Sequence, residues 1–139
     1  MFPLTLTACT VVNALGHGLA ATRQALHARR SGLQPCDFEG TRLPAWIGEV
    51  AGVDGVRLPA PLAAYDGRNN RLAQLALDQD DFAARVAAAV ARHGRARVAV
   101  VVGTSTSGIL ETEHAYQRRD PQTGALPASF HFATTQNLH

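Results

Sequence analysis

The sequence predicts an α/β fold, in which short strands lead through glycine-containing turns into helices. Two stretches carry this prediction. Residues 4–12 are rich in threonine, valine and leucine and run towards a turn at Gly16, and residues 98–102 form a continuous apolar run that ends at Gly103. The composition agrees with a globular chain, because 46% of the residues are hydrophobic and only 17% are charged.

The first predicted unit is a strand followed by a helix. After the strand at residues 4–12, the apolar positions Leu15, Leu19 and Leu26 recur at helical spacing. Two arginines favour the last turn through the helix dipole, and Gly32 is expected to end the helix.

The middle of the chain is predicted to be mostly helical. Residues 45–51 are expected to form a short strand, and the loop that follows, through two prolines to Gly67, is expected to lack regular structure. A helix is predicted from Asn70. A second, alanine-rich helix is predicted to begin with a cap at Asp80 or Asp81 and to end at Gly94, a residue type that commonly ends helices.

The last third is predicted to hold the central strand of the sheet. Residues 98–102 do not alternate, as expected for a parallel strand covered on both faces. A glycine- and serine-rich loop follows, and then a helix with Glu111 and Glu113 in its first turn, which ends before Asp120. The final TTQNL stretch resembles the opening of a helix with nothing to close it, so the chain is expected to stop within an element.

The composition also excludes several chemistries and partners. All thirteen basic residues are arginine, so no lysine is present for a Schiff base or a P-loop. Three arginines at 92, 95 and 97 lack interleaved aromatic residues, which favours a solvated turn over a nucleic-acid site. Two distant cysteines, Cys9 and Cys36, and the lack of a long apolar run predict a cytoplasmic protein with reduced thiols and no membrane span.

No metal or cofactor is predicted. Glu111 and His114 have the i, i+3 spacing of a carboxylate-bridged metal centre, but the chain has no second pair of this kind. Gly16 and Gly18 fit the G-x-G-x-x-A fingerprint of dinucleotide-binding βαβ modules. That reading also needs an acidic residue at the end of a second strand, and Asp37 and Glu39 have the right distance but no predicted strand before them.

An esterase is a further alternative. The segment around Ser105 nearly matches a nucleophile elbow, and Asp120 and His131 follow in the order of the α/β-hydrolases. Ser107 occupies the last glycine position of that motif, where a side chain would crowd the sharp turn. The simpler interpretation is a loop of small residues at the end of a strand, which lets another group approach closely.

Three segments together resemble the amino-terminal half of β-ketoacyl-acyl-carrier-protein synthases. They are the opening strand and turn, residues 25–33 (ALHARRSGL) and residues 97–109 (RVAVVVGTSTSGI), and they preserve the family's order and spacing over most of the chain. The tail FHFATTQNL is similar to the segment that precedes the nucleophile strand in that family. Within the family the sequence looks closest to the synthases of aryl-polyene-type pigment clusters.

This resemblance implies the amino-terminal half of a thiolase-like fold, a mixed sheet with covering helices, which is incomplete as given. It implies decarboxylative condensation of an acyl thioester with malonyl-carrier protein, an acyl carrier protein as partner, and a homodimer or a heterodimer. The family's catalysts are a cysteine at a helix amino terminus, two histidines and a lysine. None has a counterpart here, so residues 1–139 are expected to form one region that ends before the nucleophile strand, with no catalytic residue.

The resemblance also assigns two residues to the acyl pocket. Thr106 falls where the family has a gating side chain, and Phe130 falls where a loop residue reaches the pocket of the partner subunit. The family commonly has glycines beside the gate, whereas Ser105 and Ser107 replace two of them here. An alternative role for Phe130 is packing in the core. Four hypotheses result: an incomplete condensing enzyme, a noncatalytic subunit that shapes a pocket, a dinucleotide-binding module and a small esterase.

Overall fold

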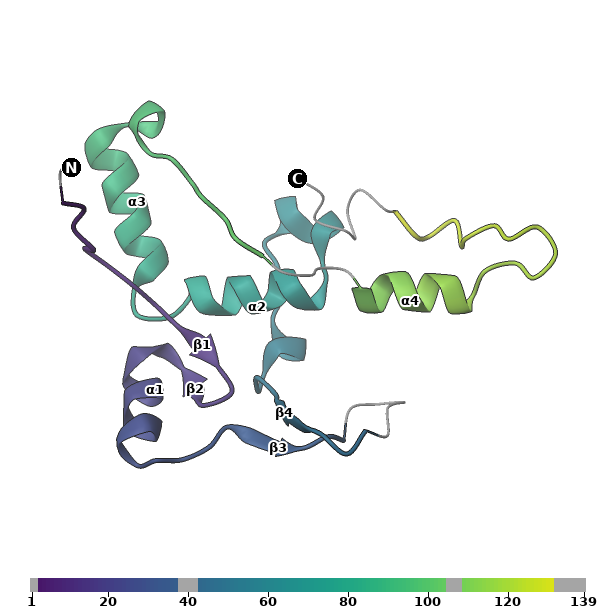
Figure 1. The fold of residues 1–139 in the computed structure, drawn as a ribbon. Coiled ribbons are helices and arrows are strands. Elements are labelled where there is room, and N and C mark those ends of the chain that lie inside the picture. The colour runs from purple at the N-terminus through teal and green to yellow at the C-terminus, as the bar shows by residue number, and fades with distance from the viewer. Residues whose placement is uncertain (1–2, 38–42, 105–108, 132–139) are drawn as a thin grey trace.

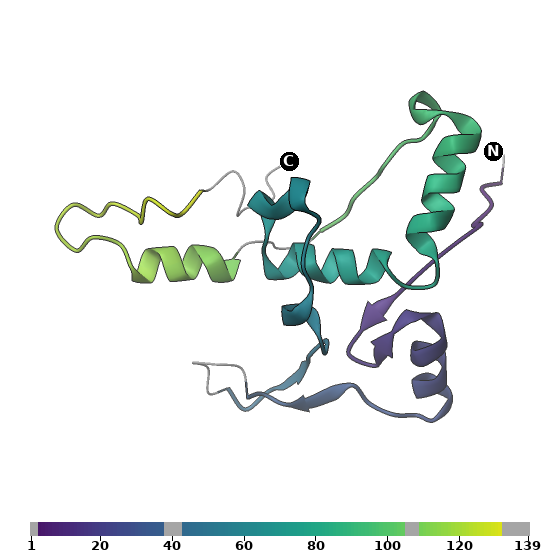
Figure 2. The ribbon, with the colours of Figure 1, turned by 180° about the vertical axis from the view of Figure 1, so that it is seen from behind.

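The computed structural model describes residues 3–37, 43–104 and 109–131, and within them it combines helices with short strands (Figures 1 and 2). The helical and strand content confirms the α/β prediction at that level. The described strands form two separate two-stranded antiparallel sheets, however, and not one mixed sheet. The single large sheet expected from the sequence is therefore not found in the described residues.

The first sheet is a tight hairpin. Strand β1 (Val12–Asn13) pairs with β2 (Gly16–His17), and the Asn13 side-chain oxygen accepts a hydrogen bond of 2.8 Å from the Leu15 N–H in the turn. An asparagine that closes such a turn is a common local arrangement. The predicted strand over residues 4–12 is wrong except at its last residue, because residues 4–11 have no neighbouring strand among the described residues with which to form a ladder.

Helix α1 (Gly18–His27) follows the hairpin directly, as predicted. It ends earlier than expected, because Arg29 adopts a left-handed conformation (φ 51°) and the Arg30 N–H donates to the Ala25 carbonyl at 2.9 Å. This is the hydrogen-bond pattern of a Schellman motif. The predicted stop at Gly32 is therefore wrong.

Gly32 instead allows two segments to approach closely. A Cβ atom at this position would lie 2.6 Å from the backbone carbonyl of Ala14, in the β1–β2 turn. Strand β3 (Leu33–Pro35) begins at the next residue and pairs antiparallel with β4 (Trp46–Gly48), the strand predicted near residues 45–51. The turn of the first sheet thus packs against the start of the second.

The segment between β4 and the next α-helix was expected to be irregular and is partly helical. It forms two 3₁₀ helices, η1 (Val53–Gly55) and η2 (Ala60–Tyr65). Proline at the second position of η2 is compatible with a helix because the first N–H groups have no helical partner. Such short 3₁₀ helices need no run of apolar periodicity, so no pattern in the sequence predicts them.

The two predicted helices of the middle segment are confirmed as α2 (Arg68–Leu77) and α3 (Phe82–His93). Asp80 and Asp81 between them both have positive φ angles, of 55° and 56°. The expected side-chain cap of α3 is absent, since the Asp81 carboxylate accepts no hydrogen bond from an N–H group at that helix end. The predicted end at Gly94 is confirmed, with φ 81°.

The predicted central strand is wrong. After the short 3₁₀ helix η3 (Arg95–Arg97), residues 98–103 run extended without any strand partner among the described residues. Val100, Val101 and Val102 are 84%, 95% and 70% exposed. An apolar run of this kind forms a central strand only when neighbouring strands are present on both sides.

The chain continues into α4 (Ile109–Gln117), the helix predicted after the glycine-rich loop. Its end is followed by a closed turn, in which the Gly124 N–H donates to the Asp120 carbonyl and the Asp120 N–H donates to the Ala125 carbonyl, each at 2.8 Å. The helix expected from the TTQNL stretch lies outside the described residues.

The apolar core is small. Among the described residues, three apolar side chains are buried, those of Ala25, Val53 and Ala115. The chain exposes 11282 Å², whereas a compact monomer of 14.7 kDa exposes about 6,900 Å².

The contact at Gly32 gives a direct test of this packing. Gly32→Ala should destabilise the fold by about 1–3 kcal/mol, because the new methyl group must displace the backbone at Ala14. Gly55→Ala is the matched control, since a Cβ atom there meets no atom within 4 Å. The free energies of unfolding of both variants would be compared by urea titration. Equal stability of the two variants would contradict the close approach.

Candidate functional site

The glycine motif at the start of α1 is occupied by a carboxylate of the same chain. The Leu19 N–H donates to the two side-chain oxygens of Asp80 at 3.2 and 3.0 Å. The Thr10 hydroxyl lies 2.9 Å from one of these oxygens and donates to it. Asp80 thus joins the helix amino terminus, the amino-terminal segment and the turn between α2 and α3.

This contact fills the position that the dinucleotide reading requires for a phosphate. Helix amino termini attract anions through free N–H groups and the helix dipole. A Cβ atom on Gly18 would lie 3.2 Å from Asp80 Oδ1, so the glycine admits the aspartate. The two strands before the helix also form an antiparallel hairpin and not half of a parallel βαβ unit. Asp37 follows a strand that is antiparallel as well.

A cavity of about 940 Å³ lies between β4, the segment after it, α2 and α4. Its apolar wall consists of Ile47, Val50, Val53, Leu72 and Leu110, and its polar wall consists of Asp37, Glu49, Arg68, Asn69, Glu113, His114 and Gln117. The cavity therefore combines an aliphatic surface with a mixed polar wall that holds three carboxylates, one arginine and one histidine.

One arginine links two acidic groups beside this cavity. Arg68, at the start of α2, lies 3.7 Å from a Glu49 oxygen and 3.4 Å from an Asp54 oxygen. Glu49 also accepts a hydrogen bond of 3.3 Å from the Gln34 amide on β3. These groups are well exposed, so the ion pairs fix the orientation of the side chains more than they add stability.

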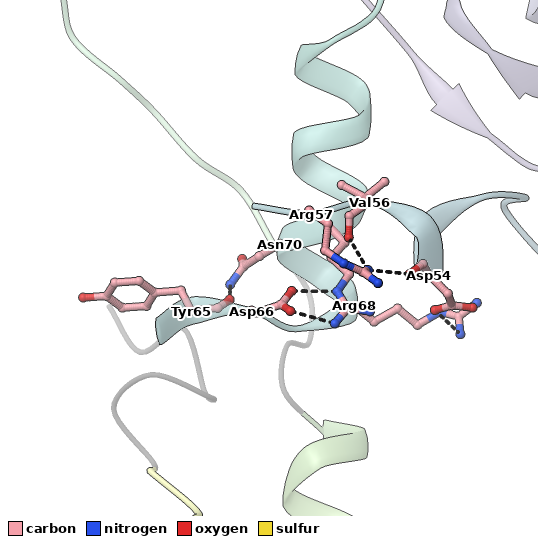
Figure 3. A network of polar contacts seen from close by, with 8 residues as sticks. Asp54, Val56, Arg57, Tyr65, Asp66, Arg68 and Asn70 are labelled. Atoms are coloured by element: carbon pink, nitrogen blue, oxygen red, sulfur yellow. Dashed lines mark hydrogen bonds and ion pairs between the residues drawn. The ribbon is translucent and has the colours of Figure 1, made fainter. Parts of the chain in front are cut away.

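A tighter polar network holds η2 against α2 (Figure 3). The Arg71 guanidinium donates two hydrogen bonds to the Asp66 carboxylate, at 2.6 and 2.7 Å. This pairing lowers the pKa of Asp66 and raises that of Arg71. The Asn70 amide donates to the Tyr65 carbonyl at 2.7 Å, so the end of η2 is tied to the first turn of α2 twice.

Of the two residues predicted for the acyl pocket, Phe130 lies among the described residues and Thr106 does not. Thr106, Ser105 and Ser107 lie outside the described residues. Phe130 is half-buried, donates its N–H to the Pro127 carbonyl at 2.9 Å, and does not line the cavity. Of the spaced pair on α4, His114 lines the cavity and Glu111 does not.

Asp120 has a structural role in its own turn. Its side-chain oxygen accepts hydrogen bonds from the N–H groups of Gln122 and Thr123, at 2.8 and 2.7 Å, and these bonds lower its pKa. An esterase would need this carboxylate to orient a histidine. The geometry among the described residues therefore gives no support to the esterase reading.

The groups that organise the site carry no signal in the sequence. The position of Asp80 before α3 predicts a cap for that helix, but its side-chain contacts lie 61 and 70 positions away in the chain. The Nε2 atom of His17 lies 2.8 Å from the Ala51 carbonyl, a contact that ties β2 to the segment after β4. No local pattern marks either contact.

Comparisons with known proteins found no matching family model, no matching curated protein and no matching solved structure. In the described part of the chain, no helix has both the length and the apolar character that crossing a membrane requires.

Asp80→Ala tests the carboxylate contact. We expect a loss of about 1–3 kcal/mol in the free energy of unfolding, because the Leu19 N–H and the Thr10 hydroxyl both lose a charged partner. Asp81→Ala is the matched control, since Asp81 has nearly the same backbone conformation and no side-chain bond to the helix that it precedes. Urea titration of both variants would measure the difference. Equal losses would show that the carboxylate contributes nothing beyond backbone conformation.

The Asp66–Arg71 pair predicts a pH dependence. The hydrogen bonds from Arg71 lower the pKa of Asp66 in the folded state. The pair therefore stabilises the fold at a pH above the unfolded pKa of Asp66, and this stabilisation is lost as the pH falls through the folded pKa. Asp66→Asn should cost up to about 1 kcal/mol at neutral pH and nothing at a pH well below the folded pKa. A double-mutant cycle with Arg71→Gln, measured at both pH values, checks this. A coupling that does not change with pH would contradict it.

Proposed function

We propose that this chain is an amino-terminal, noncatalytic part of a β-ketoacyl-acyl-carrier-protein synthase with a thiolase-like fold. The complete enzyme would condense an acyl thioester with malonyl-carrier protein, with loss of carbon dioxide, in fatty acid or polyketide-type synthesis. Its partners would be an acyl carrier protein and a second synthase subunit, in the cytoplasm.

The observation that carries the proposal is that residues 98–102, an apolar run, are extended and exposed. This run has the composition of a buried strand, leads into Gly103 and helix α4, and stands extended and exposed. Continuous apolar runs of this kind are typical of parallel strands that are covered on both faces. The exposure supports a chain that completes its sheet against further polypeptide.

The role of the chain in such an enzyme follows from its residues. It has no lysine, and neither cysteine begins a helix, so it cannot hold the family's catalytic set. Its contribution would be the scaffold and part of the wall of the acyl pocket, with Thr106 at the gate and Phe130 directed to the partner's pocket. Phe130 is not among the residues that line the cavity beside α4.

The isolated 139-residue chain should show no condensation activity. Acyl and malonyl thioesters of a carrier protein would be incubated with the pure chain, and β-ketoacyl product would be measured by mass spectrometry. Turnover above the enzyme-free blank would refute the proposal.

A second experiment tests for the missing catalytic part. The polypeptide encoded after His139, or a neighbouring chain, should contain a strand that leads into a cysteine at a helix amino terminus. Co-expression of that polypeptide with this chain should restore condensation. In the assembled enzyme, Phe130→Ala should change the preferred acyl length, while Tyr116→Ala, at an exposed position on α4, should leave it unchanged. The lack of such a cysteine would also contradict the proposal.

A further inference from the structure

Residues 68–93 contain no glycine and no proline, yet they form two helices and not one. Glycine and proline are the residues that most strongly disfavour the interior of a helix. Helix α2 ends at Leu77 and α3 begins at Phe82, and Figures 1 and 2 both show a bend between the two. No strong helix breaker in the sequence explains this bend.

The backbone at the bend is strained. Asp80 and Asp81 both lie in the left-handed region, with φ angles of 55° and 56°. Aspartate tolerates this region better than most residues, but two such residues in succession still cost free energy. The bend also interrupts the helical hydrogen bonds, because the Phe82 N–H donates to the Gln79 carbonyl at 2.9 Å and not to the carbonyl four residues before it. A continuous helix would remove both costs.

Contacts from two other segments hold the bend in place. The Asp80 carboxylate accepts hydrogen bonds from the Leu19 N–H at 3.0 Å and from the Thr10 hydroxyl at 2.9 Å. The same hydroxyl lies 3.2 Å from the Ala76 carbonyl. In a continuous helix that carbonyl would accept the Asp80 N–H instead. Helix α1 and the amino-terminal segment therefore stabilise the bend against a straight helix.

We infer that residues 68–93 are a two-state element and that the Asp80 carboxylate is the latch that selects its state. With the latch closed, α2 and α3 are separate helices. With the latch open, they join into one continuous helix, which moves α3 and the residues after it away from the amino-terminal segment. Such a change belongs to the known class of switching transitions between two packings of one segment. The inference does not depend on the proposed synthase function.

The sequence keeps the two states close in free energy. Helix α3 is rich in alanine, the best helix former, and none of its residues is fully buried, so little packing is lost when it moves. Residues 78–81 favour a helix less, because three of the four are aspartates. In a continuous helix, Asp78 and Asp81 would also lie one turn apart with like charges. The hydrogen bonds of Asp80 can therefore decide between the two states.

The distance between two spin labels tests the two states. Ala73→Cys on α2 and Ala91→Cys on α3, both exposed positions, would carry the labels in a background with Cys9→Ser and Cys36→Ser. In a continuous helix these positions are five turns and about 27 Å apart, and a bend between them gives a shorter distance. Pulsed electron paramagnetic resonance of the labelled chain should show mainly the shorter distance. Adding Asp80→Ala should shift the main population to the longer one.

Asp81→Ala is the matched control, because it makes the same change at a left-handed residue and leaves the latch intact. It should keep the shorter distance. Thr10→Val removes one donor to the latch without altering residues 68–93, so it tests the inference even if Asp80→Ala does not fold, and it should raise the population of the longer distance. The inference would be overturned by an Asp80→Ala chain that keeps the shorter distance, by an equal shift in Asp81→Ala, or by a Thr10→Val population equal to that of the wild type.

Discussion

The contact on which the described fold most depends is the carboxylate of Asp80 at the amino terminus of α1. Its oxygens accept hydrogen bonds from the Leu19 N–H and the Thr10 hydroxyl, while its own backbone turns the chain from α2 into α3. A left-handed backbone at a residue other than glycine costs free energy unless its surroundings favour it. Since only three apolar side chains are buried among the described residues, hydrogen bonds of this kind have a larger share than usual in positioning the elements.

The four described α-helices could be predicted from the sequence, but of the predicted strands only the one near residues 45–51 is largely found, as β4, because helices and strands depend on different distances along the chain. Every hydrogen bond within α3 joins residues four apart, and its alanines and terminal glycine favour a helix wherever the segment lies. Residues 4–12 and 98–102 also have the composition of strands. A strand, however, is stable only beside a neighbouring strand, and a run of valines does not indicate which segment of the chain, if any, supplies that neighbour.

The candidate site shows the same division. The turn and helix around Gly16 and Gly18 were predicted correctly, because glycine spacing is a local property. The group that occupies the helix end was not, because Asp80 is 61 positions from Leu19. The cavity is assembled from β4, α2 and α4, whose polar residues share no spacing that would mark them as neighbours. Thr106, assigned by resemblance, lies outside the described residues, so its role remains a proposal.

The exposed valine run restricts the ways in which residues 98–102 can bury their side chains. Valine loses side-chain freedom in a helix, so this segment does not hide its side chains by becoming helical. The adjacent Gly94 and the 3₁₀ turn Arg95–Arg97 separate it from α3, so that helix does not extend over it. Hydrogen bonds to water satisfy its backbone groups but leave its side chains exposed. A further strand alongside the run would satisfy its backbone groups and cover its side chains at the same time, which is why the run supports a sheet completed by further polypeptide.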